Sequence, residues 1–349
     1  MEDLDTLVLR TALDWQTAGL PVVLVTVART WGSSPRPPGS LMAINGRGET
    51  AGSVSGGCIE DDLIVRIRKE GTQAVCASGL PTVLRYGISA DEAHRFGLPC
   101  GGTVELVLEP VSALSRLDEL LLACERRHST ERVLDLQTGQ VQLRAGRRDG
   151  VPRLDGKQLA TYLGPQARLI VIGAGDLSRY LCQMALSLGF EVVVCDPREE
   201  YRASWLLDGV TVSHEMPDDL VLQLQPDART AVVALTHDPK LDDLALIDAL
   251  QSEAFYVGAI GSRRNSEQRR DRLRTYFDIT EPALQGLHGP AGMYIGSKTP
   301  AEIALSIMAE IVAVKNGVLL PSATPVVDGK SLYESAGRQA SAAVSSCTV

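Results

Sequence analysis

The seven cysteines of this 349-residue chain are scattered, and no two of them have the Cys-x-x-Cys spacing. Their odd number and irregular spacing argue against a disulfide framework, a zinc ribbon and an iron–sulfur cluster. The chain also lacks an apolar run of the roughly 18 residues that a membrane span needs, and its first residues are acidic where those of a signal peptide are basic. We therefore expect a cytoplasmic protein without a membrane partner.

The chain also has no excess of basic over acidic residues, because its formal net charge is −9. Proteins that bind nucleic acids carry basic patches, so no nucleic-acid partner is expected, although a few arginines could still surround an anionic ligand. Apolar residues make up 44% of the chain and charged residues 22%, which is typical of globular proteins. The length suits two domains better than one.

The composition changes at a polar, turn-rich stretch, residues 146–156, and we predict a domain boundary just after it, near Leu163. Residues 1–163 mix helix, strand and hairpin patterns and form the first predicted domain. Residues 164–320 alternate regularly between strands and helices, which predicts a Rossmann-like, doubly wound parallel sheet with helices on both faces. Residues 321–349 are rich in Ser and Ala without periodicity and are predicted to be disordered.

The stretch from Gly52 to Asp62 predicts the end of a strand, a glycine turn, Cys58 and the start of a helix. A helix N-terminus lowers the pKa of a thiol, and the backbone N–H groups of Ser55, Gly56 and Gly57 could face an anion there. The three acids that follow Cys58 oppose this shift. The alternative is a small buried cysteine at a helix start.

Two further loops have the composition of binding sites. The first, Gly97-Leu-Pro-Cys100-Gly101-Gly102, again places a cysteine beside glycines. The second runs from residue 29 to residue 39, and its three prolines and two glycines favour a fixed, unusual path. Its guanidinium and hydroxyl groups, which suit a phosphate, belong to Arg29, Arg36, Ser33 and Ser34. The alternative is a rigid connector whose arginines are solvated.

The second predicted domain begins with a strand that runs into Gly173-Ala-Gly175 and a helix. The next strand ends at Asp196, roughly 20 residues further on, which is the layout of a dinucleotide-binding βαβ unit. Ser178 stands where the third glycine of that motif is expected. The alternative is a Rossmann-type fold with an empty crevice.

Later strands of this domain also end in polar residues, and ligands bind at the carboxyl ends of parallel strands. His237 follows one strand, Arg263 and Arg264 follow another at the start of a helix, and His288 lies in a glycine-rich loop. A helix N-terminus can hold an anion. The alternatives are that His237 and Asp238 form a helix cap and that both arginines are solvated.

Taken together, these motifs resemble the XdhC/CoxI family, and the resemblance extends from about Leu20 to Gly317. The motifs that carry it in the first predicted domain are Arg29-Thr-Trp-Gly-Ser-Ser-Pro-Arg-Pro-Pro-Gly, Gly-Gly-Cys58-Ile-Glu-Asp-Asp and Pro-Cys100-Gly-Gly. Those in the second are Tyr256-Val-Gly-Ala-Ile-Gly-Ser-Arg-Arg, Leu-His288-Gly-Pro and Ile295-Gly-Ser-Lys-Thr-Pro-Ala-Glu-Ile-Ala. Members of this family are accessory factors of xanthine dehydrogenase and related molybdenum hydroxylases.

The resemblance implies a family-specific N-terminal domain and a Rossmann-like C-terminal domain. It implies that the protein binds the molybdenum cofactor, as molybdopterin or its dinucleotide form, supports its sulfuration and delivers it to an apo molybdenum hydroxylase. A cysteine desulfurase and a second copy of the chain are the other expected partners. The glycines, arginines, histidines and hydroxyls named above would hold this anionic cofactor, and Cys58 and Cys100 are the candidates for contact with molybdenum, for which thiolates are apt ligands.

Two other functions stay open on the residues alone. An NAD(P)-dependent oxidoreductase would use the glycine turn and Asp196, but no clear hydride-transfer group accompanies them and the first domain would be unexplained. A hydrolase with Cys58 or Cys100 as nucleophile would need His237 or His288 as its base. A cofactor-binding chaperone is therefore the leading expectation, ahead of a catalyst.

Overall fold

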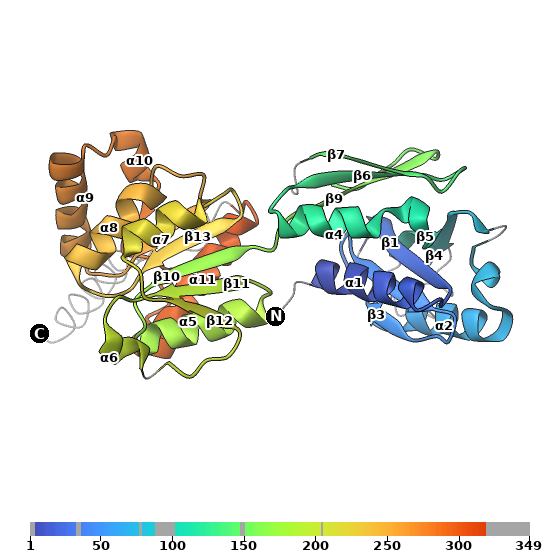
Figure 1. Ribbon diagram of the computed structural model, residues 1–349, viewed down its shortest axis with the longest axis horizontal. Coiled ribbons are helices and arrows are strands. Elements are labelled where there is room, and N and C mark those ends of the chain that lie inside the picture. Colours follow the sequence, from blue (N-terminus) through green and yellow to red (C-terminus); the bar gives the residue numbers. More distant parts are fainter. Residues whose placement is uncertain are drawn as a thin grey trace, which may run out of the picture. The chain divides into compact units, whose positions relative to one another are not determined.

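The computed structural model describes residues 4–32, 36–76, 79–87, 102–146, 151–203 and 205–318. The chain divides into two compact units, Glu2–Gln166 and a second that starts at Ala167 (Figure 1). Four predicted site residues lie outside the described residues, as does the predicted tail, residues 321–349. These four are Ser33, Ser34, Cys100 and Gly101.

The first unit is built on a five-stranded antiparallel sheet with the order β3-β2-β1-β5-β4. Its strands are β1 (Val22–Trp31), β2 (Leu41–Asn45), β3 (Thr50–Gly52), β4 (Thr82–Tyr86) and β5 (Thr103–Pro110). The central strand β1 begins with a β-branched apolar run that is buried on both faces, so it needs a cover on each side.

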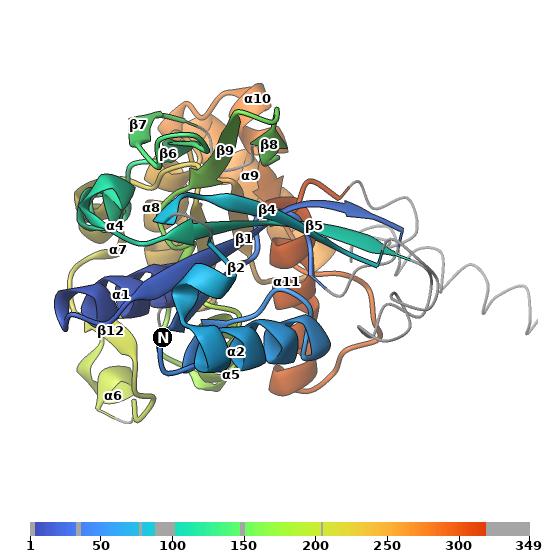
Figure 2. The ribbon, with the colours of Figure 1, turned by 90° about the vertical axis from the view of Figure 1, so that its right-hand side faces the viewer.

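Helices provide that cover (Figure 2). Helix α2 (Cys58–Glu70) places Ile59, Leu63 and Ile67 at helical spacing against one face of the sheet. Helices α1 (Leu4–Thr17) and α4 (Leu117–Glu125) pack on the other face. Short 3₁₀ turns at Thr72–Ala74 and Ala113–Ser115 follow α2 and precede α4.

A second sheet of the first unit has the order β7-β6-β9-β8. Its strands are β6 (Thr130–Asp135), β7 (Val141–Ala145), β8 (Arg153–Leu154) and β9 (Gln158–Leu163). The hairpin of β6 and β7 is as predicted, whereas β8 and β9 were not expected. Strand β9 is held by six register pairs with β6, a partner distant in sequence, and this pairing leaves no local signal.

The second unit contains a parallel six-stranded sheet with the order β12-β11-β10-β13-β14-β15, the Rossmann order of strands. The strands are β10 (Arg168–Ile172), β11 (Glu191–Cys195), β12 (Val210–Ser213), β13 (Thr230–Ala234), β14 (Tyr256–Ala259) and β15 (Leu287–His288). Central strands β10 and β13 are buried along their whole length, as continuous apolar runs predict. The predicted fold class is confirmed.

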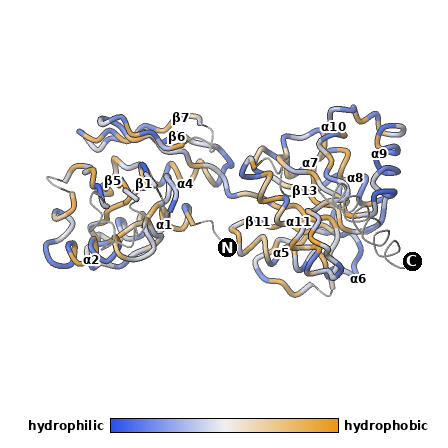
Figure 3. The backbone as a smooth tube through the Cα atoms, turned by 180° about the vertical axis from the view of Figure 1, so that it is seen from behind, coloured by the Kyte–Doolittle hydropathy of each residue, from blue (hydrophilic) through white to orange (hydrophobic). Residues whose placement is uncertain are grey.

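Helices cover both faces of this sheet. Helices α5 (Asp176–Ser187) and α11 (Pro300–Lys315) pack on one face, and α7 (Pro217–Leu224), α8 (Pro239–Ala249) and α9 (Arg263–Phe277) on the other. Short helices α6 (Glu199–Arg202) and α10 (Glu281–Gln285) lie in connections. Figure 3 shows α11 largely in hydrophobic colours and α9 in blue. Helix α11 was expected to be buried nearly all round, but Leu305 is 52% exposed.

Within the described ranges, no helix has both the length and the apolar character required to cross a bilayer.

Candidate functional site

Cys58 is the first residue of α2, as predicted, and its thiol is exposed. The two glycines before it have left-handed or related backbone angles, with φ of 90° at Gly56 and 150° at Gly57. A side chain would be strained at either position, although its Cβ would meet no atom of the described residues within 4 Å. The glycine turn therefore allows the sharp entry into α2 that leaves the sulfur accessible.

Glu60 folds back from the first turn of α2 into this glycine loop. Its Oε1 accepts hydrogen bonds from the backbone N–H groups of Val54 (2.9 Å), Ser55 (2.8 Å) and Gly56 (3.1 Å) and from the Ser53 hydroxyl (2.8 Å). Its Oε2 accepts from the Gly57 N–H group (2.9 Å) and from the Ser55 hydroxyl. A carboxylate of the chain itself thus fills the cradle of N–H groups.

Burial raises the pKa of Glu60, but the hydrogen bonds from Ser55 and Ser53 and from the loop backbone outweigh it and hold the pKa well below its usual range. Glu60 is therefore ionised at neutral pH. An external anion would have to displace this carboxylate to reach the N–H groups of the loop. The predicted roles of Ser55, Gly56 and Gly57 in cofactor binding stay predictions.

Cys58 is expected to react with iodoacetamide at least tenfold faster than Cys76, Cys182 or Cys195, because a buried thiol is both shielded and harder to ionise. Burial raises the pKa of Cys76 and of Cys195 to about 12, and it raises the pKa of Cys182 further. Peptide mass spectrometry after timed alkylation measures the four rates. Equal rates at Cys58 and Cys182 in folded protein would contradict the exposed position of Cys58.

Arg29 lies in β1 and not in a loop, because β1 continues past a β-bulge to pair with β5 as far as Trp31. Its guanidinium donates to the Leu154 carbonyl oxygen and lies 3.7 Å from the Glu105 carboxylate, which also accepts from Arg85 at 2.7 Å. The Arg29 side chain is 44% exposed. A ligand could therefore contact the exposed part of the Arg29 guanidinium while its bonds to Leu154 and Glu105 remain in place. The predicted contact of Arg29 with a phosphate stays a prediction.

Arg36 is half-buried and precedes a pocket that was not predicted from the sequence. The pocket has a volume of about 290 Å³ and lies between Pro37–Leu41, Pro152 and the end of β9. It was missed because β9 itself was missed. The proline loop thus forms one wall of a cavity, and Asp5 is the one charged residue in its lining among the residues that the structure describes.

In the second unit, Gly173 and Gly175 lie between β10 and the N-terminus of α5, as predicted. A pocket of about 190 Å³ opens there, lined by Ala174, Gly175, Asp176, Arg179, Tyr201 and Trp205. Trp205 has a buried indole N–H group that finds no partner among the described residues. The pocket therefore combines a helix N-terminus, a cation and two aromatic rings, which suits a phosphate attached to a ring system.

Asp196 directly follows β11 and is fully buried, but its acceptor capacity is used within the chain. Oδ1 accepts from the backbone N–H (3.0 Å) and Nε (2.9 Å) of Arg198, and Oδ2 accepts from Arg198 Nη2 (2.8 Å) and the Ala174 N–H group (2.9 Å). Four donors occupy the roughly four lone-pair sites of the carboxylate. Arg198 is 25% exposed and stacks over Tyr201, so a cation borders the pocket where a ribose-binding acid was expected.

Gly175→Val is expected to fold normally and to lose ligand binding at the α5 pocket. Gly175 has φ near −90°, and a Cβ there would meet no atom of the described residues within 4 Å, so the added side chain would extend into the pocket. Gly173→Val is the matched control, because its φ of 108° and a 3.0 Å approach to Thr236 would destabilise the unit. Thermal unfolding and cofactor binding separate the two effects. Unimpaired cofactor binding by folded Gly175→Val would exclude this pocket.

His237 follows β13, is exposed, and has a left-handed φ of 63°, a conformation in which histidine is enriched. The loop around it is fixed by hydrogen bonds. Asp238 caps α8 at the Lys240 N–H group, and Thr236 donates its N–H and hydroxyl groups to Asp242. This cap agrees with the alternative stated above, in which His237 and Asp238 form a helix cap, and the side chain that caps α8 is that of Asp238.

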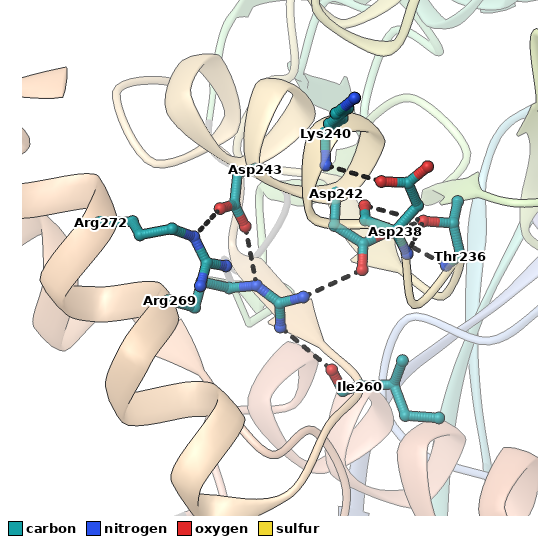
Figure 4. A network of polar contacts seen from close by, with 8 residues as sticks. All are labelled: Thr236, Asp238, Lys240, Asp242, Asp243, Ile260, Arg269 and Arg272. Atoms are coloured by element: carbon teal, nitrogen blue, oxygen red, sulfur yellow. Dashed lines mark hydrogen bonds and ion pairs between the residues drawn. The ribbon is translucent and has the colours of Figure 1, made fainter. Parts of the chain in front are cut away.

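The same loop is tied to the end of β14 by a buried ion network (Figure 4). Arg269 of α9 donates to Asp242 (3.0 Å) and Asp243 (3.0 Å) of α8 and to the Ile260 carbonyl oxygen (3.0 Å). Arg272 donates to the other oxygen of Asp243 at 2.7 Å. The network holds two strand ends at the carboxyl edge of the sheet in fixed positions.

Arg263 and Arg264 begin α9 after the N-cap Ser262, and Arg264 is exposed. His288 ends β15, stacks on Tyr256 with ring centroids 4.3 Å apart, and its Nδ1 lies 3.1 Å from Glu310 Oε1. The Tyr256 contact and the role of Glu310 were not predicted, because they join residues far apart in sequence.

The predicted site residues that the structure describes therefore fall into two groups. One group lies at the carboxyl edge of the parallel sheet: Gly173, Gly175, Asp196, His237, Arg263, Arg264 and His288. The other lies in the first unit: Arg29, Arg36, Ser55, Gly56, Gly57 and Cys58. Sequence reasoning missed Arg179, Arg198, Tyr201, Trp205 and Glu310. Among the described side chains, no three His, Cys, Asp or Glu residues form a metal-binding group, so the proposed contact of Cys58 with a metal rests on that thiol and on Cys100.

Comparison with known proteins gives consistent matches. The first unit matches the model of the XdhC and CoxI family over residues 15–87, and the second matches the XdhC Rossmann domain over residues 169–311. A probable xanthine dehydrogenase subunit from Bacillus subtilis is 24% identical over 333 residues, covering 85% of this chain and 94% of that protein. The molybdenum cofactor insertion chaperone PaoD from Escherichia coli is 26% identical over 309 residues, 88% of each chain.

A crystal structure described as a xanthine dehydrogenase from Bacillus halodurans superimposes with a TM-score of 0.70 at 25% identity and covers 92% of this chain and 98% of that one. The likeness thus spans both units, as the two family models do. The chain belongs to the XdhC/CoxI family, and its second unit is an XdhC Rossmann domain.

Proposed function

We propose that this protein binds the molybdenum cofactor as cargo and delivers it to an apo molybdenum hydroxylase. The observation that carries the proposal is the pocket at the N-terminus of α5, with Arg179 and the rings of Tyr201 and Trp205 in its wall. The cargo is a phosphorylated pterin dithiolene, sometimes extended to a dinucleotide, so a carrier needs cations, backbone N–H groups and ring surfaces.

The α5 pocket offers each of these groups to the phosphate end of the cargo. Gly175 leaves room for close approach to the first N–H groups of α5. Arg179 pairs with Asp176 at 2.9 Å in an exposed ion pair, which contributes little stability and can exchange for a phosphate. Arg198 adds a second cation on the side of Tyr201. We propose that these residues hold the phosphate or pyrophosphate.

Cys58 would supply the soft group that a molybdenum–sulfur centre requires. Its exposed position at the start of α2 suits contact with the metal or shielding of its terminal sulfur. We propose that this thiol, with Cys100, supports the cofactor while it is sulfurated by a cysteine desulfurase. The remaining parts of the proposal are a cytoplasmic location and a homodimeric carrier.

The similarity to PaoD and to a probable xanthine dehydrogenase subunit supports this function. The test is anaerobic purification from cells that make the cofactor, followed by oxidation of bound pterin to its fluorescent form. We expect about one pterin per chain in the parent, less in Cys58→Ser, and activation of apo-enzyme in proportion to the pterin carried. Protein free of pterin after such purification would contradict the proposal.

An NAD(P)-dependent oxidoreductase is the second candidate, because the strand order of the second unit is that of dinucleotide-binding domains. The saturated carboxylate of Asp196 counts against it, since a ribose hydroxyl would have to displace Arg198. Titration of the purified protein with NADH, followed by its fluorescence, distinguishes the two. Tight binding of NADH by pterin-free protein would favour the oxidoreductase.

A further inference from the structure

Glu310 of α11 is a buried acid that the cargo pocket does not use. Its Oε2 accepts hydrogen bonds from the Tyr256 hydroxyl (2.6 Å) and from the Gly292 N–H group (2.7 Å), and its Oε1 faces His288 Nδ1 at 3.1 Å. Burial raises the pKa of Glu310, but hydrogen bonds from His288 and Tyr256 outweigh it and keep the pKa below its usual value. Glu310 is thus an ionised acceptor at neutral pH.

An ionised carboxylate can only accept hydrogen bonds, so Nδ1 of His288 must carry the hydrogen. In the neutral ring the lone pair is then on Nε2, for which the described residues provide no partner. The ring itself cannot turn freely, because it stacks on Tyr256, whose side chain is fully buried. The His288 side chain remains 30% exposed. One ring nitrogen is therefore fixed by the protein and the other is left for a ligand.

The position of His288 in the fold indicates where that ligand would lie. It is the last residue of β15, at the carboxyl edge where parallel sheets bind their ligands. The next residue, Gly289, packs so closely on the first turn of α9 that a Cβ there would come within 3.3 Å of Ser266 Oγ. That hydroxyl is also buried and without a partner among the described residues. Two polar groups with unused capacity thus lie at the same strand end.

We propose that Glu310 is a positioning residue that holds His288 in the Nδ1–H tautomer, so that Nε2 accepts a hydrogen bond from a ring N–H group of the pterin. The pterin contact rests on the proposed function, whereas the tautomer does not depend on it. No proton or electron is transferred in this role. His288 would instead recognise a heteroaromatic N–H group at the carboxyl edge of the sheet.

Glu310→Gln tests this role because glutamine keeps the shape of the glutamate side chain and replaces one accepting oxygen by an NH₂ group, which donates. The buried Gly292 N–H group can only donate, so it and the Tyr256 hydroxyl select the amide oxygen. The amide NH₂ group then faces His288 Nδ1, which must accept, and the hydrogen moves to Nε2. We expect the tautomer to invert and cofactor affinity to fall about tenfold, the size of one lost hydrogen bond at a ligand contact.

The measurement uses ¹⁵N-histidine-labelled protein, in which the shifts of the two ring nitrogens report the tautomer. His288→Gln assigns the His288 signals and tests the ligand contact directly if Glu310→Gln does not fold. Tyr256→Phe is the matched control: it removes one donor to Glu310 but keeps the stacked ring, so the Nδ1–H tautomer and the cofactor affinity should both persist.

An Nε2–H tautomer in the parent would overturn the positioning role. Parental cofactor affinity in folded Glu310→Gln with an inverted tautomer, or in folded His288→Gln, would overturn the pterin contact. A parent protein that binds no pterin would overturn the proposed function and the contact with it, whereas the tautomer assignment would be judged from the nitrogen shifts alone.

Discussion

Replacement of Arg269 by methionine is expected to lower the free energy of unfolding of the second unit by about 3–5 kcal/mol, the usual cost of breaking a buried ion pair on one side. Arg269 donates to both Asp242 and Asp243, and neither carboxylate is open to water. Methionine keeps most of the volume of the side chain, so the loss reports the uncompensated charges rather than a cavity. Urea unfolding of parent and variant measures it.

Arg272→Met is the control for this prediction. Arg272 is about one third exposed, and within the described ranges it donates to Asp243 alone, which would keep its bond to Arg269. Its loss should cost about 1 kcal/mol or less. Equal losses of unfolding free energy in the two variants would show that the buried ion pairs of Arg269 contribute no more to stability than the partly exposed ion pair of Arg272.

The pH dependence of the Arg269→Met loss supplies an independent check. Burial already raises the pKa of Asp242, and Arg269 opposes that shift. Without Arg269 the folded-state pKa of Asp242 should rise further above its unfolded value. The free energy of unfolding of the variant, relative to that of the parent, should therefore be higher at low pH and should decline as the pH rises from the unfolded pKa of Asp242 toward the folded one. A loss that is the same at pH 5 and pH 8 would contradict this account.

The second unit was predictable from the sequence because its strands are short apolar runs separated by helical patterns. Strand β10, its glycine turn and α5 follow one another locally, and their order leaves little choice of topology. The first unit was less predictable. Strand β9 lies just beyond a polar stretch, and its position depends on pairing with β6. Neither hydrophobic periodicity nor turn residues therefore predict this strand from the local sequence.

The site was predictable to the extent that it depends on topology. His237, Arg263 and His288 were expected at strand ends, and the parallel sheet places them at one edge. Partner choice was not predictable, because it depends on loop dihedrals that bring one side chain to several donors. Asp196 was expected to be open to a ligand, yet the turn after β11 directs Arg198 onto it.

Glu60→Gln is expected to lower the free energy of unfolding of the first unit by about 2–3 kcal/mol at pH 7, because charge-assisted hydrogen bonds are lost and a buried donor is left unpaired. The better of its two amide orientations keeps the oxygen toward Val54, Ser55 and Gly56 and turns the NH₂ group against the Gly57 N–H group. Urea unfolding measures the loss. Asp61→Asn, a change to an exposed acid in the same turn, is the control and should cost less than about 1 kcal/mol.

The sign of the pH dependence follows from the lowered pKa of Glu60. A carboxyl whose folded-state pKa lies below its unfolded value contributes stability that is complete above the unfolded value, about 4.3, and is lost as the pH falls toward the folded one. The difference between parent and Glu60→Gln should therefore shrink by about 1 kcal/mol from pH 7 to pH 3.5. A constant difference across that range would mean that the carboxylate charge is not what the loop requires.

Glu60→Ala asks whether the loop before Cys58 can bind an external anion at all. Truncation frees four backbone N–H groups that Glu60 occupies in the parent. We expect inorganic phosphate at millimolar concentration to raise the melting temperature of Glu60→Ala and to leave that of the parent nearly unchanged, because only the variant has an open cradle. If phosphate stabilised both equally, it would act elsewhere, for example at the α5 pocket, which Gly175→Val would then abolish. If it stabilised neither, the predicted phosphate contacts of Ser55, Gly56 and Gly57 would be wrong, and the loop would serve only to hold Cys58 at the start of α2.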